Sequence, residues 1–451
     1  MDDKNFANVT LILNAFREFA DIIKKNGGLT VNQFINFIEP KFIEAGYRQQ
    51  SKVTAYTARR QTKILILHDA GAGDFVINSG FLREIRRLYP NAYIALCVKS
   101  NVIQLAELCP YVDEVILNEG KFTYANFNEM FSDYIKLAEK FLAAKFDICY
   151  SLAYLAETNF LMYMSGARVR ITVNVYTDLI EEKNFANTKF FNFKNTSPLS
   201  TKIASRPQYR CHRVDMIFHI LEEILGAPID NRDLEIWYSP LDAAFAKNLF
   251  VKLHRPFYAL CLGCSHERKK YPPEKYAKFL ELVVKDEPQA TFVILGGGKS
   301  DLQSAQILKQ NLDEKFFSEH VIDLTNKTNY RQSAAIINLC DAYIGNDTGT
   351  MHMAAALKIP VLEVNCFPAD LKIKMGDILA VYYPYGVPNV IVRPKNALSE
   401  CSADKPHDVY GCRVALKPHC ITQIMPQTIL SGLNILKKRI AEKNFKPLYI
   451  F

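Results

Sequence analysis

The stretch HDAGAGD at residues 68–74 combines two glycines with a carboxylate. Gly71 and Gly73 lack a Cβ, so the backbone of this loop can come close to a ligand such as an acceptor substrate. Asp74 follows at a predicted helix start, where a carboxylate that faces a cleft can take the proton of an attacking hydroxyl as a general base. The same carboxylate can instead stabilise the helix dipole, and the spacing alone leaves both interpretations open.

A dinucleotide fingerprint is the main competing interpretation of this stretch. The pattern G-x-G-x-x-G requires glycine at position 76, where the sequence has Val76. The next predicted strand ends in Lys99 rather than in an acid that could bind a ribose hydroxyl. The negative charge of an acid directly after Gly73 would also repel a bound pyrophosphate. The stretch is therefore better explained as part of an acid–base site.

The stretch GNDTGTMHMAAA at residues 345–356 predicts a strand that breaks into a helix capped by Asp347 or Thr348. Free N–H groups at such a helix start bind phosphate oxygens, and Gly349 would let the ligand approach. His352 lies on the first turns of the same helix, near the expected anion. A histidine before an alanine-rich helix face is more often a packed structural residue, so its role as a ligand stays open.

The stretch SHERKKYP at residues 265–272 places Ser265 and the basic pair Lys269 and Lys270 after an apolar run. A lysine at this point can bind a diphosphate while it becomes a leaving group and offset the growing negative charge. A solvated basic loop is the ordinary alternative interpretation.

The three stretches follow short, continuous apolar runs of the kind that buried parallel strands show. Such runs alternate with helical patterns twice along the chain, which predicts two doubly wound, Rossmann-like α/β lobes. Ligands of these sheets bind at the carboxyl ends of the strands, where all three stretches fall. The expected strands include residues 63–69, 92–98, 114–117 and 146–153, then 257–263, 290–298, 321–324, 341–347 and 360–364; the expected helices include 75–88, 102–109, 214–225, 273–286, 330–339, 350–357 and 427–442.

Composition excludes several classes of protein. The 55 basic and 47 acidic residues give a net charge of +8, which fits an anionic ligand or a weak attraction to an anionic surface. The basic residues do not cluster into a stripe, so the sequence does not predict a nucleic-acid partner. Residues 1–10 lack the pattern of a signal peptide, and no window holds the roughly 18 apolar residues of a membrane span. We expect a cytoplasmic protein without a transmembrane segment, at most peripheral to the inner membrane.

Taken in order, the three stretches resemble the motifs of glycosyltransferase family 9, the heptosyltransferases of lipopolysaccharide assembly. In that family a G-D pair follows the first strand, K-x-W-P follows the first strand of the second lobe, and D-T-G-x-x-H opens a later helix. Here Gly73-Asp74, Lys269-Lys270-Tyr271-Pro272 and residues 347–352 occupy these places, with Tyr271 instead of tryptophan. The resemblance extends over residues 62–440.

The resemblance implies the GT-B architecture and a sugar transfer that inverts the anomeric centre without a catalytic metal or other cofactor. It implies ADP-heptose as the donor and a saccharide or protein hydroxyl as the acceptor, and leaves the oligomeric state open. Asp74 would be the catalytic base and Lys269 would contact the donor phosphates, with Lys270 beside it in the same motif. The remaining donor-binding positions would be Ser265, Asp347, Thr348, Gly349 and His352.

On this basis the chain divides into four parts. Residues 1–60 form a helical extension and linker, with amphipathic stretches at 9–25 and 31–47. Residues 61–240 form the acceptor-side lobe, in which 172–210 is an irregular excursion near the substrate. Residues 241–425 form the nucleotide-sugar donor lobe, and residues 426–451 form a closing helix.

The eleven cysteines fall into two groups. Most stand alone in apolar runs, where a free cysteine behaves as a small buried hydrophobe; Cys97, Cys149, Cys261 and Cys340 are examples. A late group could instead supply the ligands of a structural zinc or iron site, although it lacks the close C-x₂-C pairs of strong zinc motifs. This group comprises Cys366, Cys401, Cys412 and Cys420, with His407 and His419 interspersed.

The heptosyltransferases that modify autotransporter adhesins, a subgroup that this chain resembles loosely, carry an iron-binding cysteine finger in a comparable late position. Free thiols in a loop are the alternative interpretation. Two other functions also stay open: a nucleotide-sugar epimerase or hydrolase on the same fold, and a non-catalytic module that binds a nucleotide sugar.

Overall fold

The computed structural model of the chain describes most of both predicted lobes. The described residues are 3–28, 33, 36–38, 40–41, 61–118, 127–152, 156–173, 202–204, 211–226, 228–251, 253–370, 379–398 and 419–451. The second predicted N-terminal helix, at 31–47, and most of the excursion at 172–210 lie largely outside them. Among the described helices, none combines the length and apolar character that a bilayer crossing requires.

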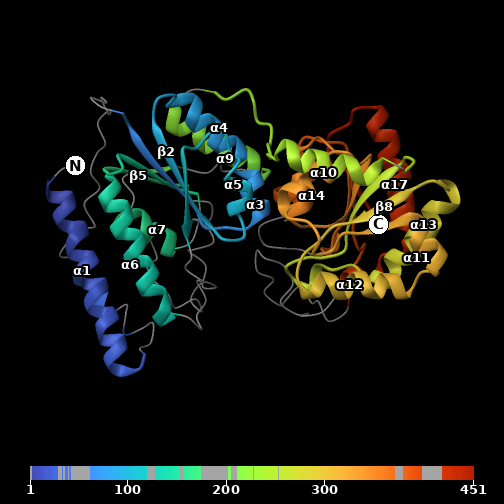
Figure 1. Cartoon of the computed structure of the whole chain (residues 1–451). Coiled ribbons are helices and arrows are strands. Elements are labelled where there is room, and N and C mark those ends of the chain that lie inside the picture. The colour runs from blue at the N-terminus through green and yellow to red at the C-terminus, as the bar shows by residue number, and fades with distance from the viewer. Residues whose placement is uncertain are drawn as a thin grey trace. The chain divides into compact units, whose positions relative to one another are not determined.

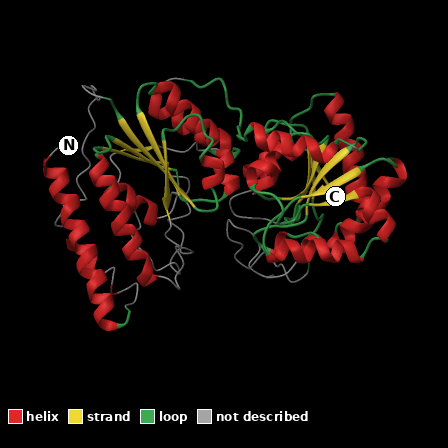
Figure 2. Cartoon of the chain, viewed as in Figure 1, coloured by secondary structure: helices red, strands yellow, loops and turns green. Residues whose placement is uncertain are grey.

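The chain forms two compact units, each built on one parallel sheet (Figures 1 and 2). The first unit comprises Met1–Gly71, Phe81–Gln208 and Met216–Asp230, and the second comprises Ala72–Gly80, Tyr209–Asp215 and Asn231–Phe451. Two parallel α/β sheets confirm the predicted fold class of two doubly wound lobes. The four-part division of the chain predicted from the sequence stays a prediction.

The first sheet has the strand order β3-β2-β1-β4-β5-β6, with all neighbours parallel. The central strand β1 is almost wholly buried, as its continuous apolar sequence predicts. The strand order reverses between β1 and β4, so the chain leaves β1 at a topological switch point. The strands are β1 (Lys63–His68), β2 (Tyr93–Lys99), β3 (Glu114–Asn118), β4 (Ile148–Ser151), β5 (Val169–Val173) and β6 (Lys202–Ala204).

Helices cover both faces of this sheet (Figure 1). On one face, α6 (Phe127–Ala144) and α7 (Ala156–Met164) pack on alternate residues of β1 and β2. The other face carries α4 (Ser79–Leu88), whose Phe81 ring meets Tyr150 of β4 edge to face. Other described helices of this half of the sequence are α3 (Ala72–Ile77), which belongs to the second unit, α5 (Ile103–Ala106) and α9 (Arg213–Leu225).

The N-terminal helix α1 (Asp3–Asn26) is part of the first unit's core rather than a separate attachment. Val9, Ile12, Phe16 and Phe19 on its apolar face are 0–3% exposed, and the helix packs with α6 and α7. The amphipathic period at 9–25 predicted this helix, but the sequence did not indicate what its apolar face would cover.

The second sheet has the strand order β13-β12-β11-β10-β7-β8-β9, again all parallel. Its order reverses between β7 and β10, so the loops after these two strands meet at one switch point. The strands are β7 (Phe257–Cys261), β8 (Thr291–Ile294), β9 (Val321–Asp323), β10 (Ala342–Asn346), β11 (Val361–Val364), β12 (Asn389–Val392) and β13 (Tyr449–Ile450).

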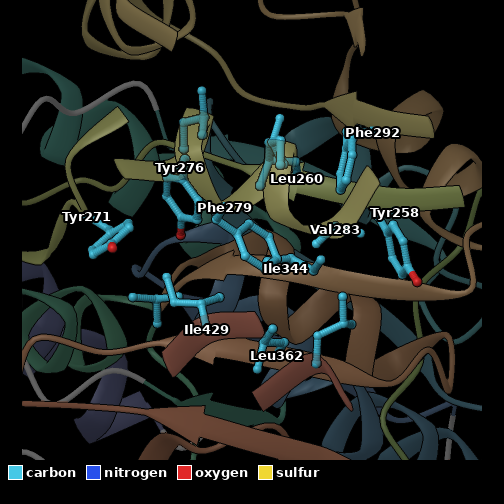
Figure 3. Packing of buried hydrophobic residues seen from close by; sticks show 14 of the residues in the cluster. Tyr258, Leu260, Tyr271, Tyr276, Phe279, Val283, Phe292, Ile344, Leu362 and Ile429 are labelled. Carbon is cyan, nitrogen blue, oxygen red and sulfur yellow. The ribbon is translucent and has the colours of Figure 1, made fainter. Parts of the chain in front are cut away.

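One face of the second sheet holds a dense aromatic and aliphatic core (Figure 3). Tyr258, Leu260, Phe292 and Ile344 from the strands meet residues of α11, α12 and α17 there. The helices α10, α14 and α15 belong to the same unit, and α15 packs on β10 and β11. The elements are α10 (Pro240–Phe250), η4 (Glu267–Lys269), α11 (Pro273–Asp286), α12 (Lys299–Gln310), α13 (Glu314–His320), α14 (Tyr330–Ile337), α15 (Gly349–Ala356), α16 (Leu379–Tyr382), η5 (Cys420–Gln423) and α17 (Pro426–Ala441).

The structure corrects three expectations about elements. The helix expected at 75–88 is two helices, α3 and α4, separated by a turn at Asn78. The Ser79 hydroxyl stabilises this break: it donates a hydrogen bond to Val76 O at 2.7 Å and accepts one from the Glu235 backbone N–H at 2.8 Å. The region from 172 contains the end of β5 and the short strand β6. The chain does not end on its last helix, since β13 pairs with β12 after it.

Candidate functional site

The start of α15 carries backbone N–H groups that the side chain of its N-cap residue does not cap. Thr348 is the N-cap residue, but its side chain makes no capping hydrogen bond. Its hydroxyl instead lies 2.8 Å from the hydroxyl of Thr350 and 3.2 Å from that of the buried Tyr343. The first turn of a helix has unpaired N–H donors and the positive end of the helix dipole, so this end of α15 suits an anion.

Asp347 does not cap α15, contrary to one sequence expectation, because its carboxylate is bound to Lys269. The Lys269 Nζ lies 2.6 Å from Asp347 Oδ2, and both side chains are less than a fifth exposed. Burial alone would lower the pKa of Lys269, but the Asp347 carboxylate and neighbouring thiols raise it above its ordinary value. Burial would likewise raise the pKa of Asp347, but the Lys269 ammonium lowers it. The pair is therefore charged over a wide pH range.

The two lysines of the basic loop point to different partners. Lys270 is 5% exposed and its Nζ contacts Glu267 Oε1 at 2.6 Å and the Ser300 hydroxyl. Only Lys269 reaches the start of α15, where its Nζ also lies 6.0 Å from the centre of the Phe367 ring. Ser265, the third predicted residue of this loop, is exposed. The structure thus brings Lys269 and Asp347 together and holds Lys270 beside α12.

Helix α3, which carries Asp74, packs directly against α15 within the second unit. A Cβ added to Gly73 would lie 3.2 Å from Gly349 Cα and 3.2 Å from His352 Cδ2, and a Cβ added to Gly349 would lie 3.1 Å from Gly73 N. Glycine at both positions therefore allows the two helices this close approach. Gly71, by contrast, has open space around its missing Cβ. Asp74 is half-buried in the first turn of α3.

His352 is influenced electrostatically by both carboxylates that the sequence singled out, those of Asp347 and Asp74. It is 4% exposed, and its Nδ1 has no hydrogen-bond partner among the described residues. Burial and the Lys269 charge lower its pKa, although the Asp347 and Asp74 carboxylates oppose this shift. Burial and the neighbouring His352 also lower the pKa of His212 to about 3. Both imidazoles are therefore neutral at pH 7, and His352 Nδ1 is available to a ligand.

Asn346, which sequence reasoning mentioned only as part of a strand, organises the switch point. It is fully buried, and its Nδ2 donates to Leu262 O at 2.9 Å. Its Oδ1 accepts from the Tyr271 backbone N at 3.2 Å and from the Tyr276 hydroxyl at 3.3 Å. The side chain thus ties the end of β10 to the basic loop. An asparagine at the end of an apolar run was the available sequence signal.

Asp301 is a second residue that sequence reasoning did not assign. Its carboxylate lies against the glycines at the ends of β7 and β8, where a Cβ on Gly263 or Gly296 would collide with it. Its Oδ2 accepts a hydrogen bond from Gly297 N at 2.8 Å. Burial raises the pKa of Asp301, although the Gly297 bond and Lys270 oppose the shift. The Asp301 carboxylate therefore lies at the carboxyl ends of the strands of the second sheet, as Lys269 and the start of α15 do.

The predicted metal site can be followed only in part. Cys401, Cys412 and His407 lie outside the described residues. The Sγ of the buried Cys420 lies 3.4 Å from His419 Nδ1, and Cys366 is half-buried elsewhere on the loop after β11. Among the described residues, no three or more His, Cys, Asp or Glu side chains are grouped to hold a metal. The metal site stays a prediction, whereas Cys97, Cys149, Cys261 and Cys340 are buried free thiols as expected.

Comparison with known proteins confirms the resemblance drawn from the motifs. Residues 188–365 match the model of glycosyltransferase family 9 (heptosyltransferase). This segment contains the basic loop and the start of α15 but not Asp74.

Among individual proteins, lipooligosaccharide heptosyltransferase 2 of Haemophilus influenzae is 31% identical over 121 residues, which are 27% of this chain and 34% of that protein. The chain thus spans about a third of the length of the curated relatives that it matches at this identity.

Solved structures of the family share the fold of the chain. A family 9 glycosyl transferase from Veillonella parvula superposes with a TM-score of 0.65 at 18% identity, covering 84% of this chain and 99% of its own. ADP-heptose lps heptosyltransferase II of E. coli gives a TM-score of 0.60 at 17% identity, with coverages of 84% and 99%. These likenesses confirm the GT-B fold class expected from the sequence.

Proposed function

We propose that the chain is an inverting glycosyltransferase that moves a sugar, heptose in the first instance, from a nucleotide diphosphate donor to a saccharide or protein hydroxyl. The observation that carries the proposal is that Asp74, the basic loop and the start of α15 lie within one unit. Lys269 pairs with Asp347 at the start of α15, and α3 with Asp74 packs against the same helix through Gly73 and Gly349. A general base and an anion site so close together suit a displacement at a phosphorylated sugar.

In this mechanism Asp74 accepts the proton of the acceptor hydroxyl while its oxygen attacks the anomeric carbon from the face opposite the diphosphate. The bond from the anomeric carbon to the diphosphate oxygen breaks, and the diphosphate leaves with the electron pair. Its growing charge is offset by Lys269 and by the N–H groups at Thr348 and Gly349. No metal ion is needed in this scheme, since fixed protein groups provide the positive charge.

The remaining predicted residues have supporting places in the proposal. Neutral His352 offers its Nδ1 to the donor or to its phosphates. Ser265 and Lys270 belong to the loop that would bind the donor. Lys270 would stabilise this loop through its contacts with Glu267 and Ser300. We keep residues 61–240 as the acceptor-side lobe and 241–425 as the donor lobe, with α3 contributing the base to the donor side.

The proposal is tested by calorimetric titration of the whole chain with ADP-heptose, UDP-glucose and GDP-mannose. We expect tight and selective binding of ADP-heptose. Selective binding of another donor would keep the transfer mechanism and discard heptose, and absence of binding to any nucleotide sugar would contradict the proposal. Nucleotide release with a changed sugar and no acceptor present would point to the epimerase or hydrolase alternative.

A further inference from the structure

Glu363 is a buried carboxyl group near the carboxyl end of β11, an interior strand of the second sheet, and none of the three stretches includes it. It lies on β11 in register with Gly345 of β10, and 1% of it is exposed. Its Oε1 accepts a hydrogen bond from Asn365 Nδ2 at 2.5 Å. Its Oε2 is buried without a hydrogen-bond partner among the residues that the structure describes. An oxygen in this state is costly unless a ligand or a proton satisfies it.

Charged groups from three neighbouring elements act on Glu363. Asp347, between β10 and α15, opposes its ionisation, whereas Lys269 of η4 and Arg393 after β12 favour it. Burial and the Asp347 charge prevail and raise the pKa of Glu363 to about 8. The ordinary value of a glutamate is about 4.3, so this side chain is mainly a neutral acid at pH 7.

Glu363 is also linked to the loop that lies against Lys269. Asn365, its hydrogen-bond partner, also accepts a hydrogen bond at its Oδ1 from the backbone N–H of Phe367, at 2.9 Å. Arg393 donates to Phe367 O at 2.8 Å and to the next carbonyl at 2.7 Å. The Phe367 ring in turn lies 6.0 Å from Lys269 Nζ. A change of charge on Glu363 therefore acts on Lys269 both through the electric field and through this loop.

We propose that Glu363 is a positioning residue of the donor site that must carry a proton for the donor to bind, so that binding takes up a proton from mildly alkaline solution. This inference rests on the proposed function, because it assumes that a diphosphate arrives beside Lys269 and Asp347. A neutral carboxyl adds no negative charge next to the diphosphate, and its proton gives Oε2 a hydrogen to donate. An ionised carboxylate would repel the diphosphate and compete with it for Lys269.

The test is calorimetric titration with ADP-heptose between pH 6 and pH 9.5. Both phosphates of this ligand are esterified, so its charge is constant over the range. We expect the Kd to be flat below pH 8 and to rise above it by up to tenfold per pH unit. Titrations in two buffers of different ionisation enthalpy should show proton uptake at pH 8 and none at pH 6.

Glu363→Gln keeps the shape of the side chain and a hydrogen to donate, so it should bind at pH 7 with a flat Kd up to pH 9.5 and no proton uptake. Glu281→Gln, the same change on an exposed residue of α11, should behave as the wild type. Should Glu363→Gln fail to fold, the wild type still tests the inference, because donor binding without proton uptake at pH 8 would refute it.

The outcomes separate this inference from the proposed function. Tight binding without proton uptake at pH 8, or equal uptake by Glu363→Gln, would refute the role of Glu363 and leave the donor site intact. Absence of binding to any nucleotide sugar at every pH would overturn the proposed function itself, and this inference with it.

Discussion

At the scale of single residues, Asp74 carries the proposed chemistry and is the first residue to change. Asp74→Asn preserves the size of the side chain but removes the group that accepts the proton. We expect kcat to fall by about 10²–10⁴-fold, the usual contribution of a general base, while the Kd for the donor changes little. Steady-state kinetics with an acceptor and calorimetry with ADP-heptose measure the two effects separately. Turnover close to that of the wild type would rule out Asp74 as the base and favour its interpretation as a helix-dipole residue.

The Lys269–Asp347 pair should contribute to stability and to binding in different ways. Lys269→Met leaves the buried Asp347 charge without a partner, which we expect to lower the free energy of unfolding by about 3 kcal/mol. The double variant Lys269→Met with Asp347→Asn should regain most of that stability, because no charge is left uncompensated. Donor affinity should stay weakened about tenfold or more in both, since the diphosphate has lost its ammonium partner. Urea unfolding and calorimetry measure the two quantities, and recovery of affinity in the double variant would contradict the proposed contact.

Glu363 should make the folded chain less stable as the pH rises. Its pKa is about 8 in the folded chain and about 4.3 in the unfolded chain, so between these values only the folded chain holds the proton. Unfolding then releases a proton, and the free energy of unfolding falls with pH at up to about 1.4 kcal/mol per unit. Glu363→Gln lacks this loss, so its stability relative to the wild type should increase from pH 5 to pH 8. Urea unfolding at both values tests this, with Glu281→Gln as the control; a constant difference would contradict it.

The sequence suggested residues for the candidate site but did not predict which partners their side chains would contact. The family resemblance brought Lys269 and Asp347 into one hypothesis, and they form an ion pair. The basic loop taken by itself could not separate Lys269 from Lys270, because the direction of adjacent side chains depends on the short turn η4 that precedes Lys270. Glu363 gave no signal, since one acid within a short apolar run does not reveal whether its side chain is exposed or buried.

At the scale of elements, the contact between α3 and α15 is the feature that would position the proposed site. Gly73→Ala would place a methyl group 3.2 Å from both Gly349 Cα and His352 Cδ2, so the helices would have to move apart by a few tenths of an ångström. Small displacements of catalytic groups are costly, and we expect kcat to fall about tenfold or more. Gly71→Ala adds a methyl group to the same loop without touching α15, because nothing lies within 4 Å of its added Cβ, so it shows what crowding of the acceptor loop alone would do. Steady-state rates of the two variants decide the point: equal rates would mean that the close approach is not needed for turnover.

The agreement between expected and observed elements follows the strength of local signals. Helix α11 begins and ends at the predicted residues, because it has a proline at its start, a clear apolar period and a following turn. The break between α3 and α4 was missed, since it depends on a hydrogen bond from Glu235 to Ser79, 156 residues apart in the sequence. The strands β6 and β13 have three and two residues and give no periodic pattern.

At the scale of the whole molecule, α1 should be necessary for the first unit and dispensable for donor binding. Phe16 is 3% exposed in a core shared by α1, α6 and α7, so Phe16→Ala should lower the free energy of unfolding by about 3–5 kcal/mol. The proposed donor residues lie in the second unit, so the Kd for ADP-heptose should be unchanged in the folded variant. Glu18→Ala, an exposed position on the same helix, should alter neither quantity. Unfolding by urea and calorimetry test this; an unstable core with weakened donor binding would show that the units depend on each other.

The assignment of α3 to the second unit has a consequence for timing in the proposed reaction. The strand β1 that leads to Asp74 belongs to the first unit, yet Asp74 itself is packed on the helix that would hold the donor phosphates. The base and the leaving group then keep one fixed separation whether or not an acceptor is present. The only reactant still to be aligned is the incoming hydroxyl, so the enzyme would be chemically ready before its second substrate arrives, and unproductive hydrolysis would be limited by how well water is kept from Asp74.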